Sequence, residues 1–584
     1  MSWAPGMGGL ARGSLLALLL SIGSLGAAFA QALALVESAP SAAVTPPAVV
    51  AAHGMVVAQE ARAARIGAEI LERGGNAVDA AVATGFALAV TYPRAGNIGG
   101  GGYMVIHLSQ GRDTTIDYRE TAPAGITRGT FLDDKGEADA AKSRDSALAI
   151  GVPGTVAGLA MAHASYGSGR FTLGELLAPA IALARAGFPI ADDLADSLPL
   201  FAPRLARWPS TARIFFHDDG GVLGAGDMLV QSDLADTLAK IARGGPAAFY
   251  EGAVAERIAE AVRQAGGVMT AEDLRAYRPI ERAPLHGSYR GYDVIAMPPS
   301  SSGGVVLLEM LNILEGYPHL AADEALRLHL AIEAMKLAYA DRAAFLGDPA
   351  MAKAPLTQLL SKSYAARLRQ HIDPEHARPA ASIRAITESA REGSNTTHFS
   401  VIDRFGNAVA NTTTLNFSYG VGLVADGTGI LLNNELDDFA AKPDSPNAYG
   451  LTGGEANAPG PAKRPLSSMS PTILLKQGQP FLVTGSPGGS RIITTVLQVI
   501  CNVVDRALPI ADAVAAPRLH NQWLPDEVMV ERGFSPDVIQ ALEARGHHVV
   551  PAPPGTSANS ILLTSQGFAG AADPRTHGAL AVGY

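Results

Sequence analysis

Two segments of helical length in this chain are apolar enough that they must be buried. Residues 77–90, AVDAAVATGFALAV, are apolar almost all round, and residues 491–505, RIITTVLQVICNVVD, also indicate a buried helix. A helix without a polar face has to be covered by other elements on every side. The chain must therefore fold in layers, and 584 residues with 48% hydrophobic content are enough for a large core.

Strand-like pairs accompany both of these helices. Residues 97–120 predict a hairpin around the polar turn SQGRD, and residues 472–484 predict another around KQGQ. Between them, residues 398–416 predict strand, turn and strand, with Gly406–Asn407 at the bend. The glycine-rich loop SPGGS follows the last of these strands.

The first half of the chain is otherwise helical in pattern. Amphipathic helices are predicted at 153–187, 228–243, 252–266 and 322–347, and Thr270 is a predicted helix N-cap. Two helix layers over stacked sheets would bury the elements of both halves. This pattern predicts an α+β fold.

The first thirty residues are typical of an export signal. Arg12 precedes the apolar run LLALLLSIGSLGAAFA at residues 15–30, and Ala28–Ala30 supplies the small residues of a cleavage site. The run is short for a membrane-spanning helix of ~20 residues, although an uncleaved N-terminal anchor is an alternative. We expect a signal peptide at 1–30 and an exported, periplasmic or secreted protein.

Composition and motifs exclude several classes of function. A net charge of -10 argues against a nucleic-acid partner, and the single cysteine, Cys501, permits neither an intrachain disulfide nor a cysteine-based metal site. The sequence contains no G-x-S-x-G, no Walker A lysine and no H-E-x-x-H, and GGGG at 99–102 lacks the spacing of a dinucleotide fingerprint. We expect no metal and no organic cofactor.

The junction EGSNTTHFS at residues 392–400 has three interpretations. Threonine suits strands, so it could be an ordinary loop-to-strand junction. Asn395 also begins an N-x-[ST] glycosylation pattern. Alternatively, the chain is cut between Asn395 and Thr396, which makes Thr396 an N-terminal nucleophile. Its free α-amino group, with an ordinary pKa of ~7.7–8.0, would then serve as the base.

Six blocks of sequence decide between these interpretations. They are DYRE at 117–120, MPPSSSGG at 297–304, TTHFS at 396–400, LNNELDDF at 432–439, KRPLSSMSP at 463–471 and GSPGGSR at 485–491. Together they resemble the signature blocks of the γ-glutamyltransferases, in order, from about residue 45 to the C-terminus. The resemblance is to the bacterial, lidded branch of the N-terminal nucleophile hydrolase superfamily.

The resemblance implies a fold and a processing step. The fold is a four-layer αββα sandwich, built jointly by a large subunit (31–395) and a small subunit (396–584) that arise by autocatalytic cleavage and stay together as a heterodimer. The implied activity transfers the γ-glutamyl group of glutathione and related amides, through an acyl-enzyme on Thr396, to water or to amino acids and peptides.

The resemblance also implies roles for particular residues. It places the nucleophile at Thr396 and its hydrogen-bonding partner at Thr414, and the oxyanion hole at Gly488 and Gly489. Arg119, Ser467 and Ser468 would hold the α-carboxylate of the γ-glutamyl group, and Asn416, Glu435 and Asp438 its α-ammonium. Residues 441–464, rich in Pro and Gly, match the lid loop, with Tyr449 as its aromatic gate.

The chemistry of these residue types agrees with the implied roles. An arginine fork with hydroxyl donors suits a carboxylate, acidic and amide oxygens suit an ammonium, and N–H groups of a Gly-Gly loop can converge on an oxyanion. Taken singly, each motif has a plain structural alternative: a surface ion pair at Arg119, a cap at Asp437–Asp438, and turns at the serine and glycine pairs.

One position departs from the commoner bacterial pattern, which has Gln where this chain has Glu435. Both side chains accept from an ammonium, so the binding role survives. Two rival functions are a cephalosporin (glutaryl) acylase of the same fold and a non-catalytic, uncleaved pseudoenzyme. A glutaryl group has no ammonium to meet Asp438, which favours γ-glutamyl substrates over the first rival.

Overall fold

The computed structural model describes residues 45–584 except 319–321, 384–395, 444, 446, 448 and 449. The predicted signal peptide at 1–30, Asn395 and Tyr449 lie outside these residues. Residues Pro47–Tyr584 form one compact unit. Within the part of the chain that is described, no helix combines the length and the apolar character needed to cross a membrane.

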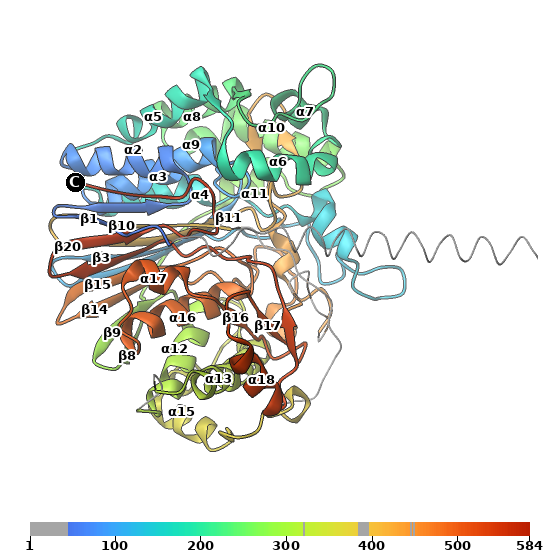
Figure 1. The fold of residues 1–584 in the computed structure, drawn as a ribbon. Coiled ribbons are helices and arrows are strands. Elements are labelled where there is room, and N and C mark those ends of the chain that lie inside the picture. The colour runs from blue at the N-terminus through green and yellow to red at the C-terminus, as the bar shows by residue number, and fades with distance from the viewer. Residues whose placement is uncertain (1–44, 319–321, 384–395, 444, 446, 448–449) are drawn as a thin grey trace, which may run out of the picture. The chain divides into compact units, whose positions relative to one another are not determined.

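Two seven-stranded sheets, whose paired strands all run antiparallel, make up the centre of this unit (Figure 1). The first has the order β21 (Leu580–Gly583), β2 (Met55–Ala58), β10 (Thr396–Ile402), β11 (Ala408–Thr414), β3 (Gly101–Leu108), β4 (Arg112–Asp117) and β7 (Ile280–Arg282). The second has the order β1 (Val49–Ala51), β20 (Gly567–Ala571), β19 (Ser560–Thr564), β15 (Gln479–Thr484), β14 (Thr472–Lys476), β9 (Tyr292–Ala296) and β8 (Leu285–Tyr289).

The alternation of side chains along the strands places the sheets face to face. In β3, Tyr103 and Val105 belong to a core cluster shared with Ile473 and Val483 of the second sheet. The intervening residues of β3 face a different cluster, together with the helices of the first half of the chain. Because successive strand residues point to opposite faces, each sheet has one face on its partner and the other on helices.

Helices cover the two outer faces (Figure 1). On the side of the first sheet lie α2 (Ala61–Glu72), α3 (Ala77–Thr91), α4 (Thr155–Tyr166), α5 (Leu173–Ala186), α6 (Asp192–Leu205), α7 (Pro209–Phe215), α8 (Ser232–Gly244), α9 (Ala247–Tyr250), α10 (Gly252–Gln264) and α11 (Ala271–Ala276). On the second lie α12 (Gly303–Glu315), α13 (Glu324–Phe345), α14 (Leu356–Leu359), α15 (Lys362–Arg369), α16 (Arg491–Val504), α17 (Ile510–Ala515) and α18 (Pro536–Ala544). The expected αββα sandwich is confirmed.

Short strands complete the unit outside the two main sheets. They are β5 (Phe188–Pro189), β6 (Met228–Leu229), β12 (Val424–Ala425), β13 (Ile430–Leu431), β16 (Leu519–His520), β17 (Val528–Val530) and β18 (Val549–Pro551).

The helices and hairpins of the sequence analysis can be compared directly with these elements. Every residue of α3 is buried, as its uniformly apolar sequence predicts, and Thr270 caps α11 with a capping box. The single helix predicted at 153–187 is wrong: α4 ends at Tyr166 and α5 begins at Leu173. Thr172 starts the second helix because its hydroxyl accepts from the N–H of Glu175, whose carboxylate in turn accepts from the N–H of Thr172.

Candidate active site

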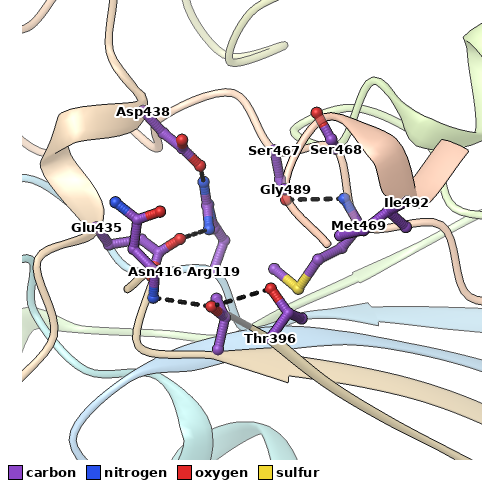
Figure 2. Close-up of a pocket in the computed structure, with 11 residues that line it drawn as sticks. Arg119, Thr396, Asn416, Glu435, Asp438, Ser467, Ser468, Met469, Gly489 and Ile492 are labelled. Atoms are coloured by element: carbon purple, nitrogen blue, oxygen red, sulfur yellow. Dashed lines mark hydrogen bonds and ion pairs between the residues drawn. The ribbon is translucent and has the colours of Figure 1, made fainter. Parts of the chain in front are cut away.

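Thr396 occupies the end of a central strand. It is the first residue of β10, and the antiparallel register places it opposite Thr414, the last residue of β11. The Thr396 hydroxyl donates to Oγ1 of Thr414 over 3.4 Å, and the same oxygen accepts from the N–H of Asn416 at 2.8 Å (Figure 2). The hairpin that the sequence predicts therefore brings these three residues together.

A pocket opens beside this hydroxyl, and its walls come from Arg119 in the first half of the chain and from segments between residues 396 and 492. The lining residues are Arg119, Thr396, Thr414, Asn416, Glu435, Asp438, Ser467, Ser468, Met469, Gly489 and Ile492 (Figure 2). Apart from Gly488, which adjoins Gly489, every described residue to which the sequence analysis gave a role lines this pocket. Their roles toward a substrate are taken up under the proposed function.

The charged residues of the pocket bind one another. The buried guanidinium of Arg119 donates to the carboxylates of Glu435 and Asp438, and its Nε donates to the carbonyl of Pro465 at 3.1 Å (Figure 2). The sequence analysis assigned the arginine and the two acids to opposite ends of a substrate. In the structure they form a single ion cluster. A bound zwitterion would therefore have to replace contacts within this cluster, with its carboxylate against Arg119 and its ammonium against the acids.

Burial strongly perturbs the acids of this cluster. It raises the pKa of Glu435 well above its usual range and raises that of Asp438, although Arg119 opposes both shifts. Glu120, behind the pocket, is fully buried with neither carboxyl oxygen hydrogen-bonded among the described residues, and burial raises its pKa to about 7. A second buried carboxyl next to Glu435 means that this group of acids retains protons at a pH where isolated carboxylates do not.

The serine pair faces the pocket with its hydroxyl hydrogens available. The Ser467 hydroxyl oxygen accepts from the N–H of Met469 at 3.1 Å, and that of Ser468 accepts from Arg342 at 3.3 Å. Among the described residues, neither hydroxyl has an acceptor for its own hydrogen. The pair is thus prepared to donate two hydrogen bonds to an anion.

The MPPSSSGG block of the first half of the chain holds this serine pair in place. The N–H of Ser467 donates to the carbonyl of Ser300 at 3.1 Å. The carbonyl of Ser467 in turn accepts from the hydroxyl of Ser302 at 2.6 Å. The block therefore supports the pocket from behind, whereas the KRPLSSMSP block lines it.

The glycine-rich loop comes next to the pocket just before α16. Gly488 has a φ of 133° and Gly489 a φ of 56°, both in the region that favours glycine. A Cβ on Gly488 would lie 2.5 Å from Cγ2 of Thr556, so no larger residue fits there without displacement. Because α16 begins at Arg491, the positive end of its dipole lies next to this loop.

His398 belongs to the TTHFS block but is not a candidate for acid–base chemistry. Its ring nitrogens face the hydroxyls of Thr412 and Ser400 at 2.9 and 3.0 Å, and burial lowers its pKa to about 3. The imidazole is therefore neutral and holds β10 and β11 together.

Asp437, which adjoins Asp438 in the sequence, is also structural, since it accepts from the hydroxyl of Ser143.

The described part of the predicted lid segment is attached to the pocket. Asn457 donates to the carbonyl of Asp438 at 2.7 Å and accepts from the N–H of Leu466 at 2.9 Å. The segment thereby connects the loop that carries the acids to the loop that carries the serines. Tyr449, its predicted gate, lies outside the described residues, so its role stays a prediction.

Sequence reasoning missed four residues that shape this site. Met469 and Ile492 supply the apolar wall of the pocket, and Glu120 and Arg342 lie buried behind it. Met469 and Ile492 sit in runs where apolar residues are expected, so nothing in the sequence marks them. Arg342 also carried no distinct signal, because the helical segment 334–345 contains two other charged residues, Lys336 and Asp341.

Comparison with known proteins shows which family has this sequence. The profile of the gamma-glutamyltranspeptidase family matches residues 63–583. The chain belongs to this family. A glutathione hydrolase proenzyme of Escherichia coli (strain K12) is 50% identical to it, over 91% of this chain and 92% of the relative.

Two solved structures extend the comparison. A gamma-glutamyltranspeptidase of Helicobacter pylori is 40% identical, with a TM-score of 0.55 over 61% of this chain and 100% of that chain. A cephalosporin acylase of Bacillus halodurans is 30% identical, with a TM-score of 0.82 over 94% of this chain and 98% of that chain. The N-terminal nucleophile hydrolase fold expected from the sequence agrees with these neighbours.

Proposed function

We propose that this protein is a γ-glutamyltransferase and glutathione hydrolase that becomes active by cutting itself before Thr396. The observation that carries the proposal is the pocket itself. A threonine hydroxyl at a strand end lies beside a cation with two serine donors on one side and two acids with an amide on the other. A γ-glutamyl group presents a carboxylate, an ammonium and an acyl carbon in the same small volume.

The proposed maturation uses the same hydroxyl as the later catalysis. The Thr396 Oγ1 attacks the carbonyl carbon of Asn395, the C–N bond breaks, and an ester with a free α-amine results. Water then hydrolyses the ester and leaves Asn395 as the new C-terminus of the large subunit. Both sheets contain hydrogen-bonded strands from both prospective subunits, which supports a heterodimer that stays assembled after the cut.

The proposed catalytic cycle has two acyl-transfer steps. The α-amine of Thr396 takes the hydroxyl proton, Oγ1 attacks the γ-carbonyl, and the oxyanion forms near the Gly488–Gly489 loop. The departing amine leaves an ester on Thr396, which water or the amine of an amino acid or peptide then attacks. Ping-pong kinetics with a γ-glutamyl anilide and a dipeptide acceptor test this cycle. Parallel lines in double-reciprocal plots of rate against donor concentration, at several acceptor concentrations, support the cycle. Intersecting lines, which indicate a ternary complex, count against it.

The donor and acceptor amines have room on the other side of the nucleophile. Thr396 also borders a larger polar cavity of about 220 Å³, whose walls include Arg94, Asp193, Ser557 and Arg575. This cavity supports a path by which the leaving amine departs and an acceptor enters.

Export to the periplasm or cell exterior stays part of the proposal, because residues 1–30 have the pattern of a signal peptide.

Asp438 should decide between γ-glutamyl and glutaryl substrates. Asp438→Asn removes a negative charge but keeps an acceptor of nearly the same shape, so attraction for the substrate ammonium falls. The ratio of kcat/KM for a γ-glutamyl anilide over a glutaryl anilide should fall by about tenfold or more, since ~1.4 kcal/mol corresponds to a factor of ten. Adding Glu435→Gln should lower the ratio further.

Asp437→Asn is the matched control, because the neighbouring acid contacts Ser143 and does not line the pocket. Its ratio should stay close to that of the unaltered protein. If the double variant Asp438→Asn/Glu435→Gln keeps the original ratio, these acids shape the loop and do not recognise an ammonium. A glutaryl anilide preferred by the unaltered protein would favour the acylase function instead.

A further inference from the structure

Arg342 is a buried cation directly behind the pocket. It lies on α13, its residue is 4% exposed, and it does not line the pocket. Its Nε donates to the hydroxyl of Ser302 at 2.9 Å, and a terminal nitrogen donates to the hydroxyl of Ser468 at 3.3 Å. Among the described residues, no carboxylate lies within ion-pair distance of it.

These two contacts reach both members of the serine pair. The contact with Ser468 uses a lone pair of its hydroxyl oxygen, so the hydroxyl hydrogen is directed elsewhere. The contact with Ser302 fixes the hydroxyl that donates to the carbonyl of Ser467 at 2.6 Å. One guanidinium thus contacts the Ser468 hydroxyl directly and supports the Ser467 backbone through Ser302, whose N–H donates to the same carbonyl at 2.8 Å.

The charge of Arg342 is compensated less directly than the charge of Arg119, because Asp438 acts on Arg342 only from beyond ion-pair distance. Arg119 is bound by Glu435 and Asp438, whereas Arg342 has only hydroxyl partners within hydrogen-bonding distance. Burial lowers the pKa of Arg342 to about 10, so it still carries its charge at neutral pH. A buried cation whose interacting acid, Asp438, is itself bound to Arg119 is costly, and an anion bound at the serine pair would reduce that cost.

We propose that Arg342 is a positioning residue that selects for the α-carboxylate of the γ-glutamyl group. It holds the Ser467 backbone through Ser302, directs the Ser468 hydroxyl into the pocket and supplies a second positive charge beneath the carboxylate. Arg119 can then bind the carboxylate without giving up its contacts with both Glu435 and Asp438. This inference rests on the proposed function and adds a residue that acts through the serines, without touching the substrate.

Three anilide substrates separate the two ends of the substrate. The γ-glutamyl anilide carries both charges, the glutaryl anilide only the carboxylate, and the 4-aminobutanoyl anilide only the ammonium. In Arg342→Gln, kcat/KM for the first two should fall by an order of magnitude or more, as for the loss of a charged hydrogen-bonding group. The value for the 4-aminobutanoyl anilide should change little. A purely structural role for Arg342 would lower all three together.

Two further variants and a control complete the experiment. Arg342→Lys keeps the charge without the fork and should recover part of the loss, mainly as a lower KM. Ser302→Ala removes only the relay to Ser467 and should shift the same ratio by a smaller factor. Arg327→Gln removes another partly buried arginine of α13, whose partner is Glu324, and should leave the ratio unchanged.

The possible outcomes separate this inference from the proposed function. A γ-glutamyl to 4-aminobutanoyl ratio that falls in Arg342→Gln, or in Ser302→Ala if the arginine variants do not fold, supports the inference. A ratio that stays constant in every variant that folds overturns it, whatever happens to the overall rate. If the unaltered, cleaved protein releases no aniline from the γ-glutamyl substrate, the proposed function itself fails.

Discussion

Thr396→Ala should remain a single chain and should transfer no γ-glutamyl group. The hydroxyl is required twice, first to attack the carbonyl of Asn395 and then to carry the acyl group. Without the first step the α-amine that serves as the base is never released. A denaturing gel should show one precursor band, and the rate of aniline release should fall to background. Thr396→Ser keeps a hydroxyl and should still cut, at a lower rate.

The adjacent threonine provides the matched control for this result. The Thr397 hydroxyl is buried and has no hydrogen-bond partner among the described residues. Thr397→Val preserves its shape and should still yield two pieces. Cleavage of the Thr396→Ala protein would place the nucleophile elsewhere, and a glycan on Asn395 in the mature protein would exclude the cut altogether.

Arg119→Ala should have the second largest effect, on substrate capture. Removing one partner of a buried, hydrogen-bonded charge pair costs about 2–5 kcal/mol, which corresponds to a loss of about thirtyfold to a few thousandfold in kcat/KM for γ-glutamyl and glutaryl anilides. The cluster also predicts an effect on folding, because Glu435 and Asp438 lose the cation that both of them bind. Thermal unfolding of the variant measures that part separately.

Arg119→Lys distinguishes the charge of this residue from its shape. A lysine keeps the counter-ion for the two acids but cannot bind both of them and a carboxylate with a planar fork. The lysine variant should therefore unfold at nearly the temperature of the unaltered protein while its kcat/KM stays well below. An alanine variant with unchanged kcat/KM for the γ-glutamyl anilide would remove Arg119 from the site.

The sequence was most informative where a locally predictable element, the hairpin of β10 and β11, also carries residues of the pocket. The turn at Gly406–Asn407 sets the register of β10 and β11, and this register alone brings Thr396 opposite Thr414. The hairpin prediction placed these two strands side by side, whereas the pairing of Thr396 with Thr414 was implied by the family resemblance. The positions of Arg119, Glu435 and the serine pair came only through family resemblance, because no local rule relates residues more than 300 positions apart.

The same local rules could not foresee how the charges would pair. An arginine and two acids on separate loops give no sign of meeting until the layers are stacked, so the sequence analysis assigned them to a substrate and not to one another. Glu120 was treated only as a neighbour of Arg119, yet both its oxygens are buried behind the pocket. The break between α4 and α5 was also missed, although Gly167, Gly169 and the Thr172–Glu175 capping box mark it in the sequence.

The most direct test of the account is the identity of the residue that carries the acyl group. The purified protein is incubated with a glutamine analogue that has an electrophile at the γ position, separated into its pieces, and examined by intact-mass and peptide mass spectrometry. The account predicts that the smaller piece begins with the sequence TTHFS and that one label sits on Thr396. A label on any other residue, or an active protein that remains a single chain, would contradict it.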